Sequence, residues 1–360
     1  LKNIIEETLD YDYPVVPISD QIGTLELFQG PTLAFKDVGA RFMARCLGYF
    51  NKINNSQKLT VLVATSGDTG GAVANGFLGV KGIEVVILYP KAKVSKVQEQ
   101  QLTTLGQNIT ALEVDGVFDD CQDMVKTAFL DQKITNKRQL TSANSINVAR
   151  WLPQMFYYFI AYRTLKKLNK PLVISVPSGN FGNICAGILA GEIGLPIDHF
   201  VASTNINDVV PDYLKTGKYS PKKSSPTLSN AMDVGDPSNF IRILKIFGND
   251  FNFLKENLSG YSFTDAETRE ALKEIHEKSG YVADPHGAVG YLGLKEYLKE
   301  HPEKYGLFLE TAHPVKFLDT VEETLNIKVE IPERLKETLS KTKKSISIKN
   351  YEDLKAFLLN

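Results

Sequence analysis

The order of apolar and polar positions along the chain alternates between two periods. Short runs of consecutive, largely β-branched apolar residues are typical of strands that are buried on both faces. Between these runs, apolar residues recur every three or four positions, which predicts amphipathic helices. The expected strands cover residues 59–64, 83–89, 109–114, 172–177 and 306–310. The expected helices cover residues 94–104, 121–130, 145–168, 265–278 and 288–298, with a further helix from Val38 that Asp37 would cap.

Strands that alternate with helices predict an α/β fold, in which parallel sheets are covered by helices on both faces. The 360 residues correspond to about two domains at roughly 150 residues each. The polar segments 51–58 and 169–171 are candidate crossings between domains, and residues 217–227 are expected to form a surface loop. For the lysine-rich tail after Glu330 we expect a solvated surface.

Composition excludes several classes of protein. With 41 basic and 42 acidic residues, the chain lacks the basic footprint of a nucleic-acid-binding protein. Its three cysteines are far apart and form no C-x-x-C motif, which argues against a disulfide framework or a zinc site and favours a cytoplasmic location. The longest strongly apolar stretch, residues 155–162, is far below the ~20 residues of a membrane span, so no membrane partner is expected.

A glycine-rich turn follows the expected strand at 172–177. It reads SGNFGN over residues 178–183 and leads into an apolar helix. Glycines allow a close approach to the backbone, and N–H groups at a helix start attract anions. Because neither a Walker lysine nor a dinucleotide fingerprint is present, a small phosphate is favoured, although a plain strand-to-helix turn is the alternative.

A second turn, TSGDTGG at residues 65–71, follows the strand at 59–64. Its hydroxyls and N–H groups crowd the start of a helix, which suits the carboxylate of an amino acid. The alternative is an ordinary capped helix, with Ser66 or Asp68 as the cap.

A third segment places Lys36 between Phe35 and the start of a helix. Most lysines are solvated, but a lysine that is desolvated by apolar neighbours has a lowered pKa and becomes a nucleophile toward an aldehyde.

Together these segments resemble threonine synthases of the bacterial and fungal branch, within the pyridoxal-phosphate (PLP) enzymes of fold type II. The resemblance rests on six motifs in family order: FQGPTLAFKD (28–37), ATSGDTG (64–70), TSANSIN (141–147), SGNFG (178–182), LSNAMDV (228–234) and TAHP (311–314). It implies two open parallel-sheet α/β domains, similar to those of the tryptophan synthase β subunit. Residues 1–50 and 160–330 would form the larger, cofactor-binding domain, 51–159 the smaller domain, and 331–360 a C-terminal tail. The cofactor would lie in the cleft between the two domains.

The resemblance also implies a role for individual residues. Lys36 would form the internal Schiff base with PLP, and the backbone N–H groups of Ser178, Gly179, Asn180, Phe181, Gly182 and Asn183 would hold the cofactor phosphate. Thr311 would face the pyridine nitrogen. Thr65, Ser66 and Thr69 would bind the substrate carboxylate, and Asn144, Ser145 and Arg150 its phosphate. A guanidinium can clamp a phosphate with two parallel hydrogen bonds.

Two features depart from related enzymes. Fold type II dehydratases carry an asparagine at the position of Asp68, where it meets the phenolic oxygen of the cofactor, so the contact made by Asp68 is open. The branch also usually has a longer segment before the lysine motif, whereas only 35 residues precede Lys36. A further N-terminal portion outside this chain is therefore an expectation.

The implied reaction is a β,γ-replacement that converts O-phospho-L-homoserine and water to L-threonine and phosphate. Lys36, once released from the cofactor, would carry the protons. A related phospholyase or serine/threonine dehydratase is the nearest alternative. A cofactor-binding protein without catalysis and a nucleotide-binding α/β protein are more distant ones. No metal is expected, and no pattern in the sequence decides the oligomeric state.

Overall fold

The computed structural model describes residues 1–54 and 58–360, so residues 55–57 of the polar segment 51–58 lie outside the described part. The described chain divides into two compact units. Unit 1 comprises Leu1–Asp10, Gly30–Arg150 and Ile331–Asn360, and unit 2 comprises Tyr11–Gln29 and Trp151–Glu330. Among the described helices, none has the length and hydropathy that crossing a membrane requires.

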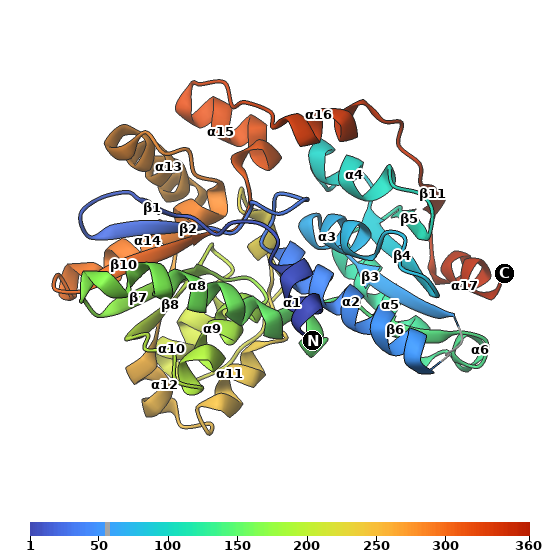
Figure 1. The fold of residues 1–360 in the computed structure, drawn as a ribbon, viewed down its shortest axis with the longest axis horizontal. Coiled ribbons are helices and arrows are strands. Elements are labelled where there is room, and N and C mark those ends of the chain that lie inside the picture. Colours follow the sequence, from blue (N-terminus) through green and yellow to red (C-terminus); the bar gives the residue numbers. More distant parts are fainter. Residues whose placement is uncertain (55–57) are drawn as a thin grey trace. The chain divides into compact units, whose positions relative to one another are not determined.

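Unit 1 is built on a five-stranded sheet in which every neighbouring pair is parallel (Figure 1). Its strand order is β11-β5-β4-β3-β6. The strands are β3 (Leu59–Ala64), β4 (Ile83–Pro90), β5 (Ile109–Val114), β6 (Gln139–Ser142) and β11 (Ile346–Ile348). Three of them lie where the apolar runs predict them.

Helices cover both faces of this sheet. Alternate side chains of a strand point to opposite faces, so each strand contributes to two clusters. Val61 and Val63 pack in one cluster with residues of α2 (Lys36–Asn54) and α3 (Asp68–Phe77). Leu62 and Ala64 pack in another. That second cluster contains residues of α5 (Phe118–Leu130), α6 (Gln132–Thr135) and α17 (Tyr351–Leu359). The remaining helices of this part are α1 (Lys2–Thr8), α4 (Lys96–Thr103), α7 (Val148–Trp151) and α16 (Glu333–Ser340).

In the C-terminal tail, Lys336, Lys341 and Lys344 are exposed as expected, but other residues of the tail pack into unit 1. Strand β11 extends the sheet beside β5, and Leu354 and Leu358 are fully buried. Lys343 lies between two carboxylates, with its Nζ 2.7 Å from Glu99 Oε1 and 2.5 Å from Glu113 Oε1. The tail is therefore an integral part of unit 1.

The units also differ from the expected domain limits at the N-terminal side. Residues 30–50, which we expected in the larger domain, belong to unit 1. The physical reason is the apolar face of α2: Ala40, Met43 and Ala44 are buried in the same cluster as the side chains of β3.

Unit 2 is built on a six-stranded sheet of order β1-β2-β10-β7-β8-β9. Strands β1 and β2 pair antiparallel and all other neighbours are parallel. The strands are β1 (Val15–Pro17), β2 (Ile22–Glu26), β7 (Leu172–Pro177), β8 (His199–Thr204), β9 (Leu258–Ser262) and β10 (Tyr305–Glu310).

Both faces of this second sheet are covered as well. Helices α13 (Asp265–Ser279) and α14 (Pro285–Glu300) pack on the side chains of Val173, Val201 and Phe308. Helices α8 (Met155–Leu165) and α9 (Gly182–Glu192) lie on the opposite face, where Gly187 leaves room for Tyr158 and Phe200. The other elements are α10 (Val209–Thr216), α11 (Phe240–Ile246), α12 (Phe251–Asn257), α15 (Leu318–Leu325), and the short 3-10 segments η1 (Leu152–Gln154), η2 (Lys166–Leu168), η3 (Asn230–Met232) and η4 (Pro314–Phe317).

Two predicted helices differ in detail. The segment 145–168 is not one helix, because a 3-10 turn with Pro153 at its start separates α7 from α8. Helix α2 begins at Lys36 rather than after Asp37, so Asp37 lies in the first turn instead of capping it. The loop at 217–227 is confirmed, and Thr264 is the N-cap of α13.

Candidate active site

Lys36 is the first residue of α2, and the loop before it is tightly fixed. The backbone N–H and the hydroxyl of Thr32 donate hydrogen bonds to the two carboxylate oxygens of Asp37, at 2.8 and 2.5 Å. Leu33 adopts a left-handed conformation with φ +60°, which allows the chain to double back. The Lys36 side chain is half-buried, and its Nζ lies 5.5 Å from the centre of the Phe35 ring. The loop thus holds an amine against an aromatic ring at a helix start.

The hydroxyl-rich loop 65–70 connects β3 to α3, and its shape is maintained by Thr65. The Thr65 hydroxyl donates to the carbonyl of Gly67 and accepts from the N–H groups of Gly67 and Gly70. Its observed partners therefore lie within the loop. Ser66 and Thr69 are partly exposed, and the N-cap residue of α3 is Gly67, which has no side chain. N–H groups in the first turn of a helix lack partners within the helix, so this end can attract an anion.

Asp68 is buried in the first turn of α3 and is bound by a glutamine. Gln98 Nε2 donates to Asp68 Oδ1 at 3.0 Å. Gln98 is therefore one partner of Asp68 within unit 1. The sequence alone did not identify a partner for Asp68.

The segment 144–150 is tied both to the hydroxyl-rich loop and to α2. The Asn144 amide pairs with the backbone of Ala64, donating to its oxygen at 2.7 Å and accepting from its nitrogen at 3.2 Å. At the other end of the segment, the backbone oxygen of Arg150 would lie 2.0 Å from a Cβ at Gly39, so only glycine permits this approach to α2. Unit 1 therefore gathers the lysine segment, the loop 65–70 and the segment 144–150 around one another.

Arg150 is deeply buried for an arginine, with 3% of its surface exposed. Its Nη1 donates to the carbonyl of Ala143. Burial lowers the pKa of Arg150 to about 10, and the nearby Asp37 acts in the opposite direction. The guanidinium remains a cation at neutral pH, and its low-dielectric surroundings strengthen its attraction for an anion. Ser145 lies half-buried in the same segment.

In unit 2, the turn 178–183 connects β7 to α9 and is shaped by close backbone packing. A Cβ at Gly179 would lie 2.6 Å from Met232 Cα and 2.8 Å from the backbone oxygen of Ala231. Phe181 has a left-handed backbone with φ +59° and packs edge-on against Phe240. The Asn180 side chain accepts from the backbone N–H and the hydroxyl of Ser238, at 2.7 and 2.9 Å. These contacts fix the backbone donors at the start of α9.

The two ends of this turn make specific side-chain contacts. The Ser178 N–H donates to the carbonyl of Ser203 at 2.8 Å, and its hydroxyl to the carbonyl of Val176. The N–H of Ser178 is thus used in a hydrogen bond to β8. The other backbone N–H groups of the turn are those of residues 179–183. At the other end, Asn183 Oδ1 accepts from the hydroxyls of Tyr157 and Tyr158, at 2.6 and 2.8 Å.

Thr311 directly follows β10, beside a buried acidic pair. The backbone N–H of Asp284 donates to Glu310 Oε1 at 2.5 Å, and the N–H of Ala312 donates to Asp284 Oδ2 at 3.3 Å. Burial and the proximity of Asp284 raise the pKa of Glu310 well above its usual range. The segment that carries Thr311 is thus held by hydrogen bonds to the N-terminus of α14.

His286, in the first turn of α14, supports the same region. The backbone N–H of Ala231 donates to His286 Nε2 at 3.2 Å, so Nδ1 carries the ring proton and donates to Asp284 at 2.5 Å. Ala231 and Met232 pack against Gly179. The His286–Asp284 pair, which holds Ala231, therefore also stabilises the turn 178–183.

The sequence did not identify Gln98, Gln101 or Lys316 as noteworthy. All three are buried, and Lys316 is only 1% exposed. Glutamines and lysines within helical patterns are usually solvated, so no local signal distinguished them.

The observed groups fit PLP and an amino-acid phosphate chemically. Unit 1 offers a primary amine, a helix start with hydroxyls, and a buried guanidinium. Unit 2 offers a turn that admits no Cβ at Gly179, beside the first-turn donors of α9. Among the described residues, no group of histidine, cysteine and acidic side chains is arranged to hold a metal ion.

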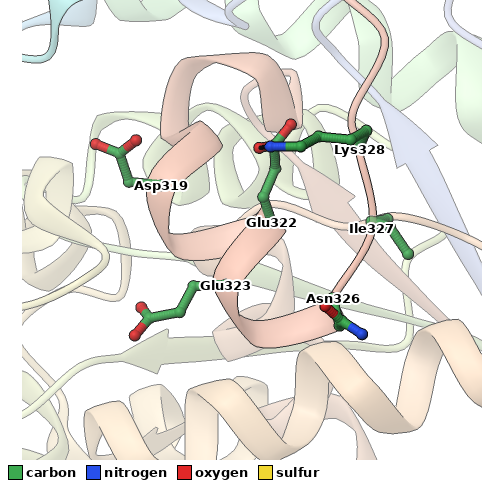
Figure 2. A pocket seen from close by; sticks show the side chains of 6 residues that line it. All are labelled: Asp319, Glu322, Glu323, Asn326, Ile327 and Lys328. Carbon is green, nitrogen blue, oxygen red and sulfur yellow. Dashed lines mark hydrogen bonds and ion pairs between the residues drawn. The ribbon is translucent and has the colours of Figure 1, made fainter.

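A surface hollow at α15 contains none of these residues. Figure 2 shows its lining side chains, among which Lys328 Nζ lies 2.6 Å from Glu322 Oε2. The remaining lining residues are Asp319, Glu323, Asn326 and Ile327. The hollow thus offers acidic and polar surface groups without a buried donor.

Comparison with known proteins agrees with this chemistry. Residues 22–309 match the family model "Pyridoxal-phosphate dependent enzyme", and residues 287–358 match "Threonine synthase, C-terminal". Similar curated proteins are threonine synthases of Buchnera aphidicola, 47% identical over 99% of this chain and 82% of that protein, and of Escherichia coli, 46% identical over 94% and 77%.

Solved structures give the same result. The crystal structure of threonine synthase from Escherichia coli is similar with a TM-score of 0.93 and 43% identity, covering 100% of this chain and 83% of that one. PLP-bound threonine synthase from Brucella melitensis is similar with a TM-score of 0.92 and 32% identity, covering 99% and 83%.

Proposed function

Since the chain belongs to the threonine synthase family of PLP-dependent enzymes, we propose that it converts O-phospho-L-homoserine and water to L-threonine and phosphate. The observation that carries this proposal is the grouping within unit 1. An amine, a hydroxyl-rich helix start and a buried arginine are held together by the contacts of Asn144 with Ala64 and of Gly39 with Arg150. The proposed substrate carries one anionic group at each end, which matches two separate sites for anions.

Lys36 and the turn 178–183 are the segments proposed to hold the cofactor. Lys36 would bind it covalently through its amine, and the backbone donors from Gly179 to Asn183 would hold its phosphate. Because the N–H of Ser178 already donates to Ser203, Ser178 would support the site by anchoring the turn to β8. Thr311 would face the pyridine nitrogen. When bound, PLP supplies an electron sink for the carbon that bears the substrate amine.

The substrate carboxylate would bind at the start of α3. Ser66 and Thr69 present partly exposed hydroxyls there, and the helix dipole adds a favourable potential. Thr65 would act by keeping the loop in shape, because its hydroxyl bonds to Gly67 and Gly70.

The substrate phosphate would bind at Ser145 and Arg150. A buried guanidinium is a strong partner for a phosphate because it donates two parallel hydrogen bonds and competes little with water. Asn144 would set the position of this segment relative to the loop 65–70 through its contacts with Ala64. Asp68 would remain close to the reacting groups, with its orientation fixed by Gln98.

Lys36 would also move protons. Its amine lies at the start of α2, close to an aromatic ring that limits its hydration, and from there it would accept and return protons. A neutral threonine hydroxyl at position 311 would not keep a proton on the pyridine nitrogen as a carboxylate would. Lys36 would therefore take a larger share of the proton transfers.

The reaction would take place in the cytoplasm, a location supported by the three free cysteines, of which Cys121 and Cys185 are buried. Burial raises the pKa of both thiols to about 12, so they stay protonated and unreactive.

Product analysis tests this function. Purified, PLP-loaded protein is incubated with O-phospho-L-homoserine, and threonine, phosphate, 2-oxo acid and ammonia are measured. The proposal expects one threonine for each phosphate released. A 2-oxo acid with ammonia and no threonine would instead identify a phospholyase, and turnover of serine or threonine in place of the phosphorylated substrate would identify a dehydratase.

A further inference from the structure

One face of α4 carries two buried glutamines. Gln98 is 1% exposed and Gln101 is 6% exposed. Residues three apart lie on the same side of a helix, so both side chains leave α4 in a similar direction. Glutamine is rarely buried to this degree unless its amide has specific partners. The partners of both residues lie in the loops that carry the proposed site.

Gln98 determines how Asp68 and Gly67 are held. Its Oε1 accepts from the N–H of Ser95 at 3.1 Å, which leaves Nε2 to donate to Asp68 Oδ1 at 3.0 Å. The amide also packs against Gly67, whose φ is +148°, because a Cβ there would lie within 2.6 Å of three amide atoms. A single side chain thus fixes both the backbone turn and the carboxylate that follows it.

Gln101 contacts the other functional segment of unit 1. Its Nε2 donates to the carbonyl of Thr32 at 3.0 Å, and Thr32 in turn donates to Asp37, the neighbour of Lys36. Among the described residues, Gln101 Oε1 is buried without a hydrogen-bond partner. A methionine of similar size would fill this space without a buried, unsatisfied acceptor, so the amide is explained by its contact with Thr32.

Helix α4 is itself anchored, so its glutamines are fixed points. The capping box of Ser95 and Gln98 defines its start. At its other end, the N–H of Lys344 donates to the carbonyl of Thr103 at 3.1 Å, and Lys343 pairs with Glu99. The C-terminal tail therefore holds the helix from which both glutamines extend.

We propose that Gln98 and Gln101 are positioning residues that hold the loop 65–70 and the lysine segment in a fixed relation to each other. This inference rests on the proposed function, because it assigns the two loops to the substrate carboxylate and to Lys36. Gln98 acts through Asp68 and Gly67, and Gln101 acts through Thr32 and the adjoining Asp37. Neither glutamine is assigned a contact with the reacting atoms.

The sharpest test exchanges a donor for a charge without changing shape. Gln98→Glu places a second carboxylate against Asp68, while one of its oxygens can still accept from Ser95. We expect KM for phosphohomoserine to rise on the order of 10-fold at pH 8, with a smaller change in kcat. The defect is expected to shrink toward pH 6, because two adjacent carboxylates share a proton and their repulsion disappears. Gln100→Glu on the same helix, where the side-chain oxygen is also buried, controls for the cost of burying a carboxylate and should raise KM less than Gln98→Glu does.

Combining Gln98→Glu with Asp68→Asn separates positioning from general destabilisation. The double variant restores a donor–acceptor pair in reverse order, so Gln98→Glu should cost little in the Asp68→Asn background. A defect of equal size in both backgrounds, or equal effects of Gln98→Glu and Gln100→Glu, would overturn the inference. If Gln98→Glu does not fold, Gln98→Met tests the same contact without charge and should raise KM by a smaller factor; an unchanged KM would overturn the inference.

Gln101→Met tests the second contact through the cofactor rather than the substrate. We expect weaker retention of PLP during dialysis, measured by visible absorbance, at an unchanged melting temperature. Absorbance equal to that of the wild type would remove Gln101 from the proposal. If the wild-type protein itself forms threonine while these variants behave like it, only this inference fails. If the wild type forms no threonine, the proposed function fails first.

Discussion

The groups that we propose for the chemistry differ in kind between the two compact units. In unit 1 the relevant groups are side chains: the Lys36 amine, the hydroxyls of Ser66 and Thr69, and the Arg150 guanidinium. In unit 2 they are mainly backbone N–H groups at the start of α9, whose position depends on the packing of Gly179 against Ala231 and Met232. The proposed contribution of unit 1 therefore depends on the identity of its side chains, and that of unit 2 depends on the shape of its backbone.

This difference predicts different consequences of mutation. A substitution in unit 1 removes a chemical group and should leave the cofactor turn of unit 2 intact. A substitution in unit 2 that adds atoms to the turn should lower affinity for the cofactor, although no reactive group is lost.

The largest expected effect is that of Lys36→Ala. It should abolish both turnover and the visible absorbance of the lysine-linked cofactor, because no other amine is assigned to bind PLP. Absorbance spectra and a threonine assay on the purified variant measure both. Lys52→Ala, an exposed position on the same helix, is the control. A variant that lacks Lys36 and keeps both properties would contradict the assignment.

Gly179→Ala should weaken PLP binding by about 10- to 100-fold, since overpacking of a filled site typically costs about 1–3 kcal/mol. The added Cβ would meet Met232 Cα at 2.6 Å. Gly191→Ala is the control in the same unit, because its Cβ would meet nothing closer than a ring atom of Phe200 at 3.8 Å. Titration of apo-protein with PLP, followed by absorbance, compares the two. Equal affinities would show that the backbone shape of the turn is not limiting.

Arg150→Ala should reduce kcat/KM for phosphohomoserine by about 100-fold, because loss of one partner in a buried charge pair costs about 2–5 kcal/mol. The cofactor absorbance should remain, since PLP is assigned to other residues. Because Arg150 is buried, a lower melting temperature is also expected, and activity is best measured well below it. Unchanged kinetics would remove Arg150 from the substrate site.

The smallest effect concerns the stability of unit 2 away from the site. Burial alone would raise the pKa of Glu274, but hydrogen bonds from Lys278, Lys295 and Tyr291 outweigh it and lower the pKa to about 2. A lowered carboxyl pKa stabilises the fold above pH 4.5, and this contribution is lost as the pH falls through 2.

Glu274→Gln should therefore reduce the free energy of unfolding by about 1 kcal/mol at pH 7, a value that allows for solvent screening. Denaturant unfolding at pH 7 and near pH 2 measures the difference, which should vanish at the lower pH. Affinity for PLP should not change. A pH-independent difference would show that the ion pairs do not contribute.

The sequence predicted strands β3, β4, β5, β7 and β10, but it predicted neither the buried strand β8 nor how the candidate site segments are held. Residues 59–64 and 172–177 were predicted correctly because strands buried on both faces leave continuous apolar runs. Strand β6, Gln139–Ser142, was missed because its partly exposed side chains give no such run. The buried tail was missed because burial of its few apolar residues depends on pairing with β5, far away in sequence.

The candidate site residues were predicted from sequence motifs. The residues that hold them in place were not predicted. The sequence around Gln98 and Gln101 is polar, and it does not show that α4 packs on the loop 65–70 and on the lysine segment. Asp37 illustrates the same limit: next to a helix start it looks like a cap, whereas its carboxylate accepts hydrogen bonds from Thr32. Hydrogen bonds between distant segments depend on tertiary structure, which pattern analysis does not contain.

The central claim is that the Lys36 amine binds the cofactor. Borohydride reduction of the PLP-loaded protein, followed by proteolysis and mass spectrometry, identifies the modified lysine directly. The account predicts the pyridoxyl group on the peptide that contains Lys36. Modification of another lysine instead, such as the fully buried Lys316, would contradict it.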